Sequence, residues 1–524
     1  MGASRRNRQK EGGPKGFRRD LVDTLSKLNK RTSAGHKRML LLLILAGTVL
    51  RVVPLFAAVT YAEALAYIRY EHGSWLAILT DRSIMENHIL HTLLVKLSTV
   101  LFGVSAVSVR LPDLVAGVLC MPLFYIFVRA MFNRYIALMA VALVAGSGPL
   151  IEVSALSEGY AVIWLFFMMA LLLGRHLIKS NDLFTALLLG VVNALGMWVD
   201  PSMIHVTVLV YTWLAVYLGG KYNSSLASRM YRWAASLLVF ALVTLLLYAP
   251  VIIAHGIGQA FAHSVAGEQR GWEILQQTHQ DSAFALWIYF NDAAAWPVSL
   301  LGFIGIVVAV YLSARYRALV LGLLVGAIPL CILQAMVPPP KVWTYALFLL
   351  HLGSAIALFY LLKYVQEQFF PKFSKRLRTA LAALAMLLLM AGLGMPGIEE
   401  HRERFPDAGD AARKLHRLMG PADVVIAEHP WDAPLQFELI AADTPRRLYR
   451  IGDPLPPGKQ LFLLVGQGDG QTYSAILEHF RVPATQLTGV EKVSDQKRLE
   501  IFAARIRTEG STSPTVEEPS AEPE

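Results

Sequence analysis

Charged residues and cysteines are both scarce in this sequence. Only 16% of the 524 residues are Asp, Glu, Lys or Arg, far fewer than in a soluble globular protein. The two cysteines, Cys120 and Cys331, fall in long apolar runs, so we expect no disulfide in an exported domain and no cysteine metal site. The chain also lacks the internal repeat that marks many secondary transporters.

Hydrophobic residues are abundant instead. They make up 55% of the chain, with a mean hydropathy of +0.47, and they gather in runs of about 20 residues, the length that crosses a bilayer. We therefore predict an all-α polytopic membrane protein with about eleven transmembrane helices. The runs are 39–58, 112–132, 136–151, 159–178, 183–199, 202–219, 233–254, 297–314, 317–336, 342–362 and 379–396.

Basic residues predict the orientation in the membrane. The first 38 residues carry twelve Lys or Arg and three acidic residues, which predicts a cytoplasmic N-terminus. Counting helices places five further basic loops on the same side. The net charge of +10 then reflects topology and contact with anionic membrane lipids, and nucleic-acid binding is not expected. The first run is too long and too far from the start for a cleaved signal peptide, so we expect a multi-pass protein of the inner (plasma) membrane.

Polar segments gather on the predicted extracytoplasmic side. They include the turns SALSEGY, WVDPS and VPPPKVW, residues 255–296, and the first loop, residues 60–111. A passive connection between two spans would need only a few polar residues, so this loop is the predicted wall of an active site. Its titratable residues include Glu63, Glu71, Asp81, Glu86, His88, Lys96 and Arg110.

The predicted domain organisation has four parts. Residues 1–38 form a basic cytoplasmic segment and residues 39–397 the transmembrane domain. Residues 398–505 alternate strand-like runs (DVVIAE, RRLYRI, QLFLLVG, RLEIFAA) with helix-like runs (GDAARKLHRLM, TYSAILEHF), which predicts a small extracytoplasmic α/β domain. Residues 506–524 are acidic and rich in Ser and Pro, which predicts a disordered tail.

Three segments resemble one enzyme superfamily. They are Arg51 followed by an acidic position and NHILHTLLVKLSTVLFGVSAVSVRLPDLVAGVL, then GPLIEVSALSEGY, then VPPPKVWTYALFLL. Together with the helix count, they resemble the GT-C glycosyltransferases, and within them the protein O-mannosyltransferase and aminoarabinose-transferase branch, over roughly residues 40 to 365. The resemblance implies a membrane enzyme that uses a polyprenyl-phosphate sugar as donor. A carboxylate would deprotonate the acceptor hydroxyl, which displaces the lipid phosphate with inversion.

The chain departs from the family pattern at two positions. Relatives usually carry an Asp-Glu pair in the first loop, where this chain has Ala62-Glu63, so Glu63 is the candidate base or the chain has lost transfer activity. Many relatives carry Arg-Gly-Tyr where this chain has Glu158-Gly159-Tyr160. Because a carboxylate repels phosphate, the donor phosphate would be held by other cations, with Lys341, Arg110 and His88 as candidates.

Each candidate also has a structural interpretation. Glu63 can be an ordinary loop carboxylate, His88 can orient the amphipathic helix HILHTLLVKL, and Arg110 is more typical of an interfacial anchor. Acidic residues at helix ends are easily solvated, and of these we favour Glu152 or Glu158 over Asp200 as functional. The predicted substrate-binding residues are Asn87, His88, Arg110, Glu152, Glu158, Tyr160 and Lys341.

Three functional hypotheses follow. The first is a glycosyltransferase acting on a glycan, lipid or protein acceptor, without a cofactor, although the sequence leaves a divalent metal open. The second is a catalytically silent relative, which Ala62 and Glu158 favour. The third is an envelope lipid or polysaccharide transporter, which would carry charges along a path through its helices, whereas here the charges form one outer layer.

Overall fold

The fold is described from a computed structural model of the chain. It describes residues 32–82, 87–220, 225–261, 271–312, 314–369, 404–444, 448–495 and 498–508, together with Ser26 and Gly392. The described residues form two compact units. The helical unit comprises Met1–Phe56, Gly73–Leu101 and Val107–His401, and the C-terminal unit comprises Ala57–His72, Phe102–Ala106 and Arg402–Glu524.

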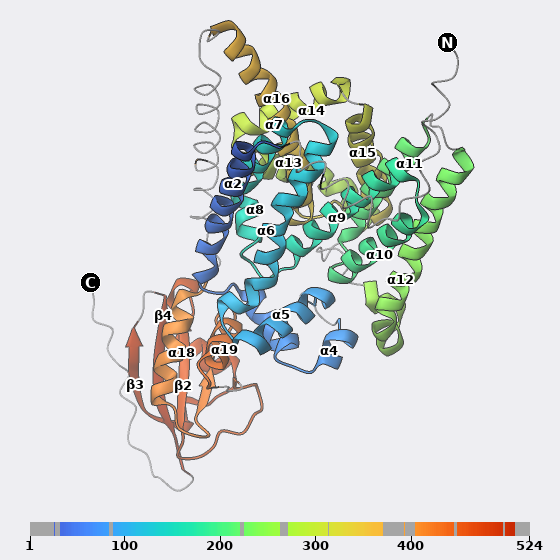
Figure 1. The fold of residues 1–524 in the computed structure, drawn as a ribbon. Coiled ribbons are helices and arrows are strands. Elements are labelled where there is room, and N and C mark those ends of the chain that lie inside the picture. The colour runs from blue at the N-terminus through green and yellow to red at the C-terminus, as the bar shows by residue number, and fades with distance from the viewer. Residues whose placement is uncertain are drawn as a thin grey trace, which may run out of the picture. The chain divides into compact units, whose positions relative to one another are not determined.

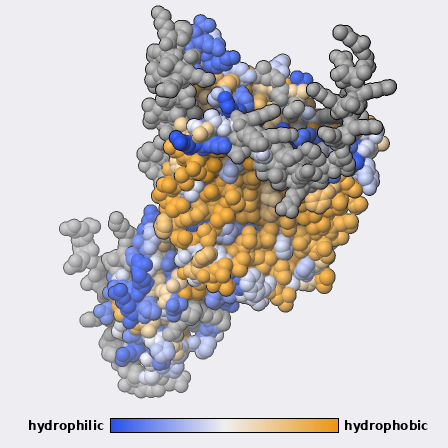
Figure 2. Space-filling model, in the orientation of Figure 1, coloured by the Kyte–Doolittle hydropathy of each residue, from blue (hydrophilic) through white to orange (hydrophobic). Residues whose placement is uncertain are grey.

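The helical unit is built from apolar helices, and hydrophobic residues cover much of its visible face (Figures 1 and 2). The helices that begin it are α2 (Ala34–Val52), α4 (Trp75–Thr80), α5 (Ile89–Phe102) and α6 (Ala106–Met131). Those that follow are α7 (Arg134–Gly146), α8 (Gly148–Val153), α9 (Tyr160–Ser180), α10 (Leu183–Val199), α11 (Met203–Leu218), α12 (Leu226–Phe261), α13 (Trp272–Ala294), α14 (Trp296–Leu312), α15 (Ala314–Gln334) and α16 (Thr344–Phe369). The short 3₁₀ segments η1 (Val53–Phe56) and η3 (Pro340–Trp343) follow α2 and precede α16.

The predicted membrane architecture is confirmed. Within the described residues, six helices are long and apolar enough to cross a membrane, or seven if the bent pair Trp272–Asp292 and Trp296–Tyr311 forms one span. The predicted spans 136–151, 183–199 and 202–219 form the shorter apolar helices α7, α10 and α11. HILHTLLVKL forms α5, with His91, Thr92 and Val95 buried and Leu97 exposed, as expected for an amphipathic helix. The predicted span 379–396 lies outside the described residues.

A buried arginine joins the first helix to the bundle. Arg51, near the end of α2, is 1% exposed. Its guanidinium donates to the carbonyls of Val144 and Ala145 at the end of α7, each at 3.0 Å, and to Gly47 in its own helix. The last carbonyls of a helix have no partner within the helix, so a buried cation there satisfies them and also complements the helix dipole.

The C-terminal unit contains a four-stranded sheet in the order β1-β2-β4-β3. Its strands are β1 (Val424–Ile426), β2 (Gln460–Gly466), β3 (Leu487–Asp495) and β4 (Leu499–Ile506), and β1 pairs with β2 in parallel while the other pairs are antiparallel. Side chains alternate along β2: Phe462 and Leu464 pack with α18 (Pro406–Leu418) and α19 (Asp432–Ala441), whereas Leu461 and Leu463 pack with α20 (Tyr473–His479). Helices therefore cover both faces of this sheet.

The predicted α/β fold of this unit is confirmed, with differences in its elements and its bounds. DVVIAE, QLFLLVG and RLEIFAA contain β1, β2 and β4, but the described part of RRLYRI, residues 448–451, is not a strand. Tyr449 there donates one backbone hydrogen bond to Val425 of β1, at 2.9 Å, without forming a ladder. Sequence analysis also missed β3 and α19. The C-terminal unit includes residues 57–72, which form α3 (Tyr61–Ala66) and the π-helical turn η2 (Tyr67–Glu71).

Candidate active site

A histidine of the first loop pairs with an aspartate more than a hundred residues away. His88 directly precedes α5, and Asp200 ends α10. The Nδ1 atom of His88 lies 2.9 Å from Oδ2 of Asp200, and the two side chains are 16% and 9% exposed. The other carboxylate oxygen accepts a hydrogen bond from the Ser202 backbone at 2.7 Å. Both oxygens of Asp200 therefore have partners. The Ser202 backbone orients the carboxylate, and the carboxylate in turn orients the His88 imidazole.

This pair favours charge on both members. Burial opposes an imidazolium, but the nearby Asp200 carboxylate and its hydrogen bond outweigh burial and raise the pKa of His88. Burial likewise opposes a carboxylate, but His88 and the hydrogen bonds from Ser202 lower the pKa of Asp200. Arg82 and Glu158 also lie within electrostatic range of His88 and act in opposite directions on its pKa.

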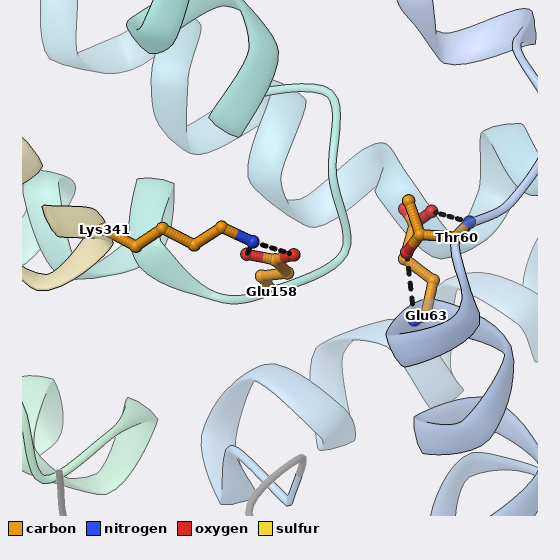
Figure 3. Close-up of polar contacts among 4 residues, drawn as sticks. All are labelled: Thr60, Glu63, Glu158 and Lys341. Carbon is orange, nitrogen blue, oxygen red and sulfur yellow. Dashed lines mark hydrogen bonds and ion pairs between the residues drawn. The ribbon is translucent and has the colours of Figure 1, made fainter. Parts of the chain in front are cut away.

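A second ion pair joins the turn before α9 to the segment before α16. The Nζ atom of Lys341, in η3, donates to both carboxylate oxygens of Glu158, at 3.0 and 3.2 Å (Figure 3). Glu158 is 14% exposed and Lys341 is 52% exposed, so the ammonium keeps access to solvent. The repulsion expected between Glu158 and a phosphate is therefore offset by a cation in direct contact with the carboxylate.

The SALSEGY turn is packed tightly onto the first loop. Gly159 has φ +79°, and a Cβ there would lie 3.3 Å from the Cβ and Cγ of His91. Ser157 donates to the Val109 carbonyl of α6 at 2.9 Å. His91 itself is buried and meets Asp113 of α6 at 2.5 Å. A glycine is needed here because the backbone has φ +79° and because a Cβ would press on His91.

The structure adds residues that sequence analysis did not select. Asp200, which the sequence favours less than Glu152 and Glu158, is the partner of His88. Arg82 is 1% exposed and its guanidinium lies 5.8 Å from the centre of the Tyr248 ring of α12. The Tyr248 hydroxyl donates to the Met197 carbonyl near the end of α10, at 2.6 Å. The sequence shows that the first loop contains an arginine at position 82, but it does not indicate that this arginine is buried.

The remaining predicted residues have different surroundings. The Tyr160 ring lies 6.3 Å from that of His88. Asn87 is buried and donates to the carbonyls of Ile78 and Asp81. The carboxylates of Glu152 and Glu158 are both within electrostatic range of the Tyr289 phenol of α13. Arg110 is fully buried rather than interfacial, and donates to the Leu55 carbonyl at 3.0 Å.

Glu63 belongs to the C-terminal unit and forms a capping box. Its Oε2 atom accepts from the Thr60 backbone at 2.9 Å, and its own backbone donates to Oγ1 of Thr60 at 3.3 Å (Figure 3). Glu63 is 2% exposed. This reciprocal arrangement fixes the carboxylate at the start of α3, and it also accounts for a glutamate at this position without any catalytic role.

Metal coordination by a protein needs several ligand side chains close together. In the part of the chain that the structure describes, no three His, Cys, Asp or Glu side chains gather closely enough to hold a metal ion.

Comparison with known proteins agrees with this architecture. Residues 87–250 match the family model described as dolichyl-phosphate-mannose-protein mannosyltransferase. The structure resembles ArnT from Cupriavidus metallidurans bound to undecaprenyl phosphate, with a TM-score of 0.57 and 14% identity, over 91% of this chain and 99% of that one. The chain has the GT-C fold.

The same fold extends to a second solved relative. Archaeal oligosaccharyltransferase AglB from Archaeoglobus fulgidus, in complex with an inhibitory peptide and a dolichol-phosphate, matches with a TM-score of 0.50 and 14% identity. That match covers 81% of this chain and 60% of AglB. Among curated proteins, none has a sequence that matches this chain. The expected resemblance to the GT-C superfamily is thus confirmed in the family model and in the fold.

Proposed function

We propose that this GT-C protein transfers a sugar from a polyprenyl-phosphate donor to an extracytoplasmic acceptor, with inversion at the anomeric carbon. The observation that carries the proposal is the cluster formed by the His88–Asp200 and Lys341–Glu158 pairs. Four segments far apart in the sequence contribute to it, all at the ends of apolar helices. Solved GT-C proteins hold undecaprenyl phosphate or dolichol-phosphate, so a related lipid phosphate is the donor class we assign.

The cluster supplies positive charge for a leaving phosphate. Lys341 is half exposed, and its contact with Glu158 places a solvent-accessible ammonium beside the turn. Burial lowers the pKa of His88, but the Asp200 carboxylate raises it above its ordinary value, which favours the imidazolium form. Preorganised cations stabilise the charge that develops on a departing phosphate without reorganising at the moment of reaction. In this proposal, Asn87, Tyr160, Glu152 and Arg110 shape the surroundings of these cations.

The transfer step needs a base as well as cations. Glu63 takes the proton of the acceptor hydroxyl, whose oxygen forms a bond to the anomeric carbon. The bond between that carbon and the phosphate oxygen breaks, and the lipid phosphate leaves with the electron pair. Attack from the face opposite the leaving group inverts the configuration. The acceptor is a glycan, lipid or protein carrying a free hydroxyl, and the anionic lipids contact the basic loops.

A silent relative is the second candidate, and one observation favours it. Glu63 is already used in the capping box with Thr60, and Ala62 stands where relatives carry an aspartate. In that case the lipid-phosphate site would bind its ligand without transfer. The two candidates differ in turnover and not in donor binding.

The experiment that tests the proposal compares cells with and without this protein. Mass spectrometry of their envelope glycolipids, polysaccharides and glycoproteins should reveal one species that lacks a sugar when the protein is absent. Purified protein in vesicles should then restore that sugar from a polyprenyl-phosphate donor. Identical glycan profiles in both strains, with lipid-phosphate binding retained by the purified protein, would favour the silent relative.

A further inference from the structure

The segment that carries Glu63 is fixed by the C-terminal unit, although more than 300 residues separate the two in the sequence. Thr60 and Arg404 form an antiparallel β-bridge. The backbone of Phe405 donates to the Val59 carbonyl at 3.4 Å, and Nη1 of Arg404 donates to the Ala58 carbonyl at 3.0 Å. Arg404 is 7% exposed, so its contact with Ala58 is shielded from solvent. These bonds hold the chain immediately before α3.

Aromatic contacts hold the helix itself. The Tyr61 ring meets the His429 ring edge to face, with centroids 4.6 Å apart. The Tyr67 ring, at the start of η2, meets Phe437 of α19 in the same manner at 5.2 Å. Tyr67 and Phe437 are both buried. Edge-to-face contacts favour one orientation, and the Tyr67–Phe437 pair is also buried, so the helix is restrained at both ends.

The backbone contacts before α3 also affect the carboxylate of Glu63. Thr60 is the residue bridged to Arg404, and its backbone N–H is also the donor to Oε2 of Glu63. A displacement of residues 58–60 would therefore move the hydrogen-bond donor that orients Glu63.

We propose that the C-terminal unit is a positioning module for Glu63, with Arg404 and Phe437 as its positioning residues, so that it sets the rate of acceptor deprotonation and leaves donor binding unchanged. This inference rests on the proposed function, because it takes Glu63 as the base. His88 and Lys341, the cations assigned to the donor phosphate, belong to the helical unit, whereas Glu63 belongs to the C-terminal unit. The inference predicts that kcat and donor KM respond separately to changes in the two units.

The test is a double-mutant cycle in the full-length protein reconstituted in vesicles. Arg404→Ala should lower kcat on the order of 10- to 100-fold, because a shift of about 1 Å in a reacting group costs that much, while donor KM stays unchanged. Arg404→Lys should recover part of the rate. Phe437→Leu removes the aromatic contact with Tyr67 and should also lower kcat. Arg413→Ala is the matched control, since Arg413 is an exposed arginine of the same unit paired with Asp410.

The decisive comparison is made in the Glu63→Gln background. If Arg404 acts through Glu63, Arg404→Ala should lower the residual rate less than threefold there, because residues in one network are not additive. The same fold-loss in both backgrounds would overturn the inference and assign Arg404 to general folding. An impaired Glu63→Gln with an unaffected Arg404→Ala would overturn only the positioning role. Full activity in Glu63→Gln would instead remove the base from the proposed function.

Discussion

The Nδ1 atom of His88 lies 2.9 Å from Oδ2 of Asp200, which joins the first loop to the turn between α10 and α11. Burial works against both charges, yet the pKa of His88 is raised and that of Asp200 is lowered, because each group is the other's partner. The pair therefore contributes to stability from above the ordinary aspartate pKa of 3.8 to beyond the ordinary histidine pKa of 6.5. That contribution is lost when pH rises through the raised pKa of His88 or falls through the lowered pKa of Asp200.

Asp200→Asn tests this relationship. The amide keeps an oxygen for the Ser202 backbone but removes the negative charge, so the pKa of His88 should fall. If the imidazolium serves the donor phosphate, the alkaline limb of the kcat/KM profile should move to lower pH. Asp281→Asn, a change at an exposed aspartate of α13, should leave the profile in place. An alkaline limb that does not move in Asp200→Asn would show that His88 does not govern it.

Lys341 is expected to serve the leaving phosphate. Lys341→Ala should reduce turnover on the order of 100-fold without lowering expression, and Lys341→Arg should keep part of the rate. Lys363→Ala is a suitable control, because Lys363 is also an exposed lysine facing a glutamate. Equal turnover in Lys341→Ala and Lys363→Ala would assign Lys341 to the membrane interface.

Gly159 is expected to be needed for more than its backbone conformation. Gly159→Ala must adopt φ +79° and also bring a Cβ to 3.3 Å from His91, whereas Gly103→Ala meets φ +78° with open space around it. Each change should cost about 1 to 2 kcal/mol for the left-handed conformation. Thermal unfolding in detergent should show a larger loss for Gly159→Ala, together with reduced transfer. Similar losses in the two variants would mean that the turn does not press on His91.

Local sequence patterns predicted much of this molecule. Runs of apolar residues located α2, α6, α9 and the other long helices, because a span is a property of consecutive residues. Pairing between distant segments was not predicted. Nothing near Asp200 in the sequence points to His88, and nothing near Arg404 indicates that it holds the chain before Glu63. Such partners depend on how helices and loops pack, which local periodicity does not encode.

For the same reason, the sequence did not indicate the partners of Glu63 and Lys341. Family resemblance selected both residues, and the structure gives each a partner that the sequence did not indicate, Thr60 for Glu63 and Glu158 for Lys341. In each case the partner changes the chemistry. Thr60 fixes the direction of one carboxylate oxygen, and Glu158 converts an isolated lysine into half of an ion pair. The catalytic roles of Glu63 and Lys341 stay predictions that turnover measurements must decide.

The most direct measurement compares transfer by wild type, Glu63→Gln and Ala62→Asp. The assay follows transfer from a polyprenyl-phosphate sugar to the acceptor identified by mass spectrometry, with protein in vesicles. Glu63→Gln keeps the shape of the side chain and an oxygen for the Thr60 backbone but cannot take a proton, so turnover should fall on the order of 100-fold or more. Ala62→Asp should maintain or raise activity and make Glu63→Gln less damaging. Full activity in Glu63→Gln would contradict the assigned base. An inactive wild type that gains transfer only through Ala62→Asp would identify a relative that has lost its base.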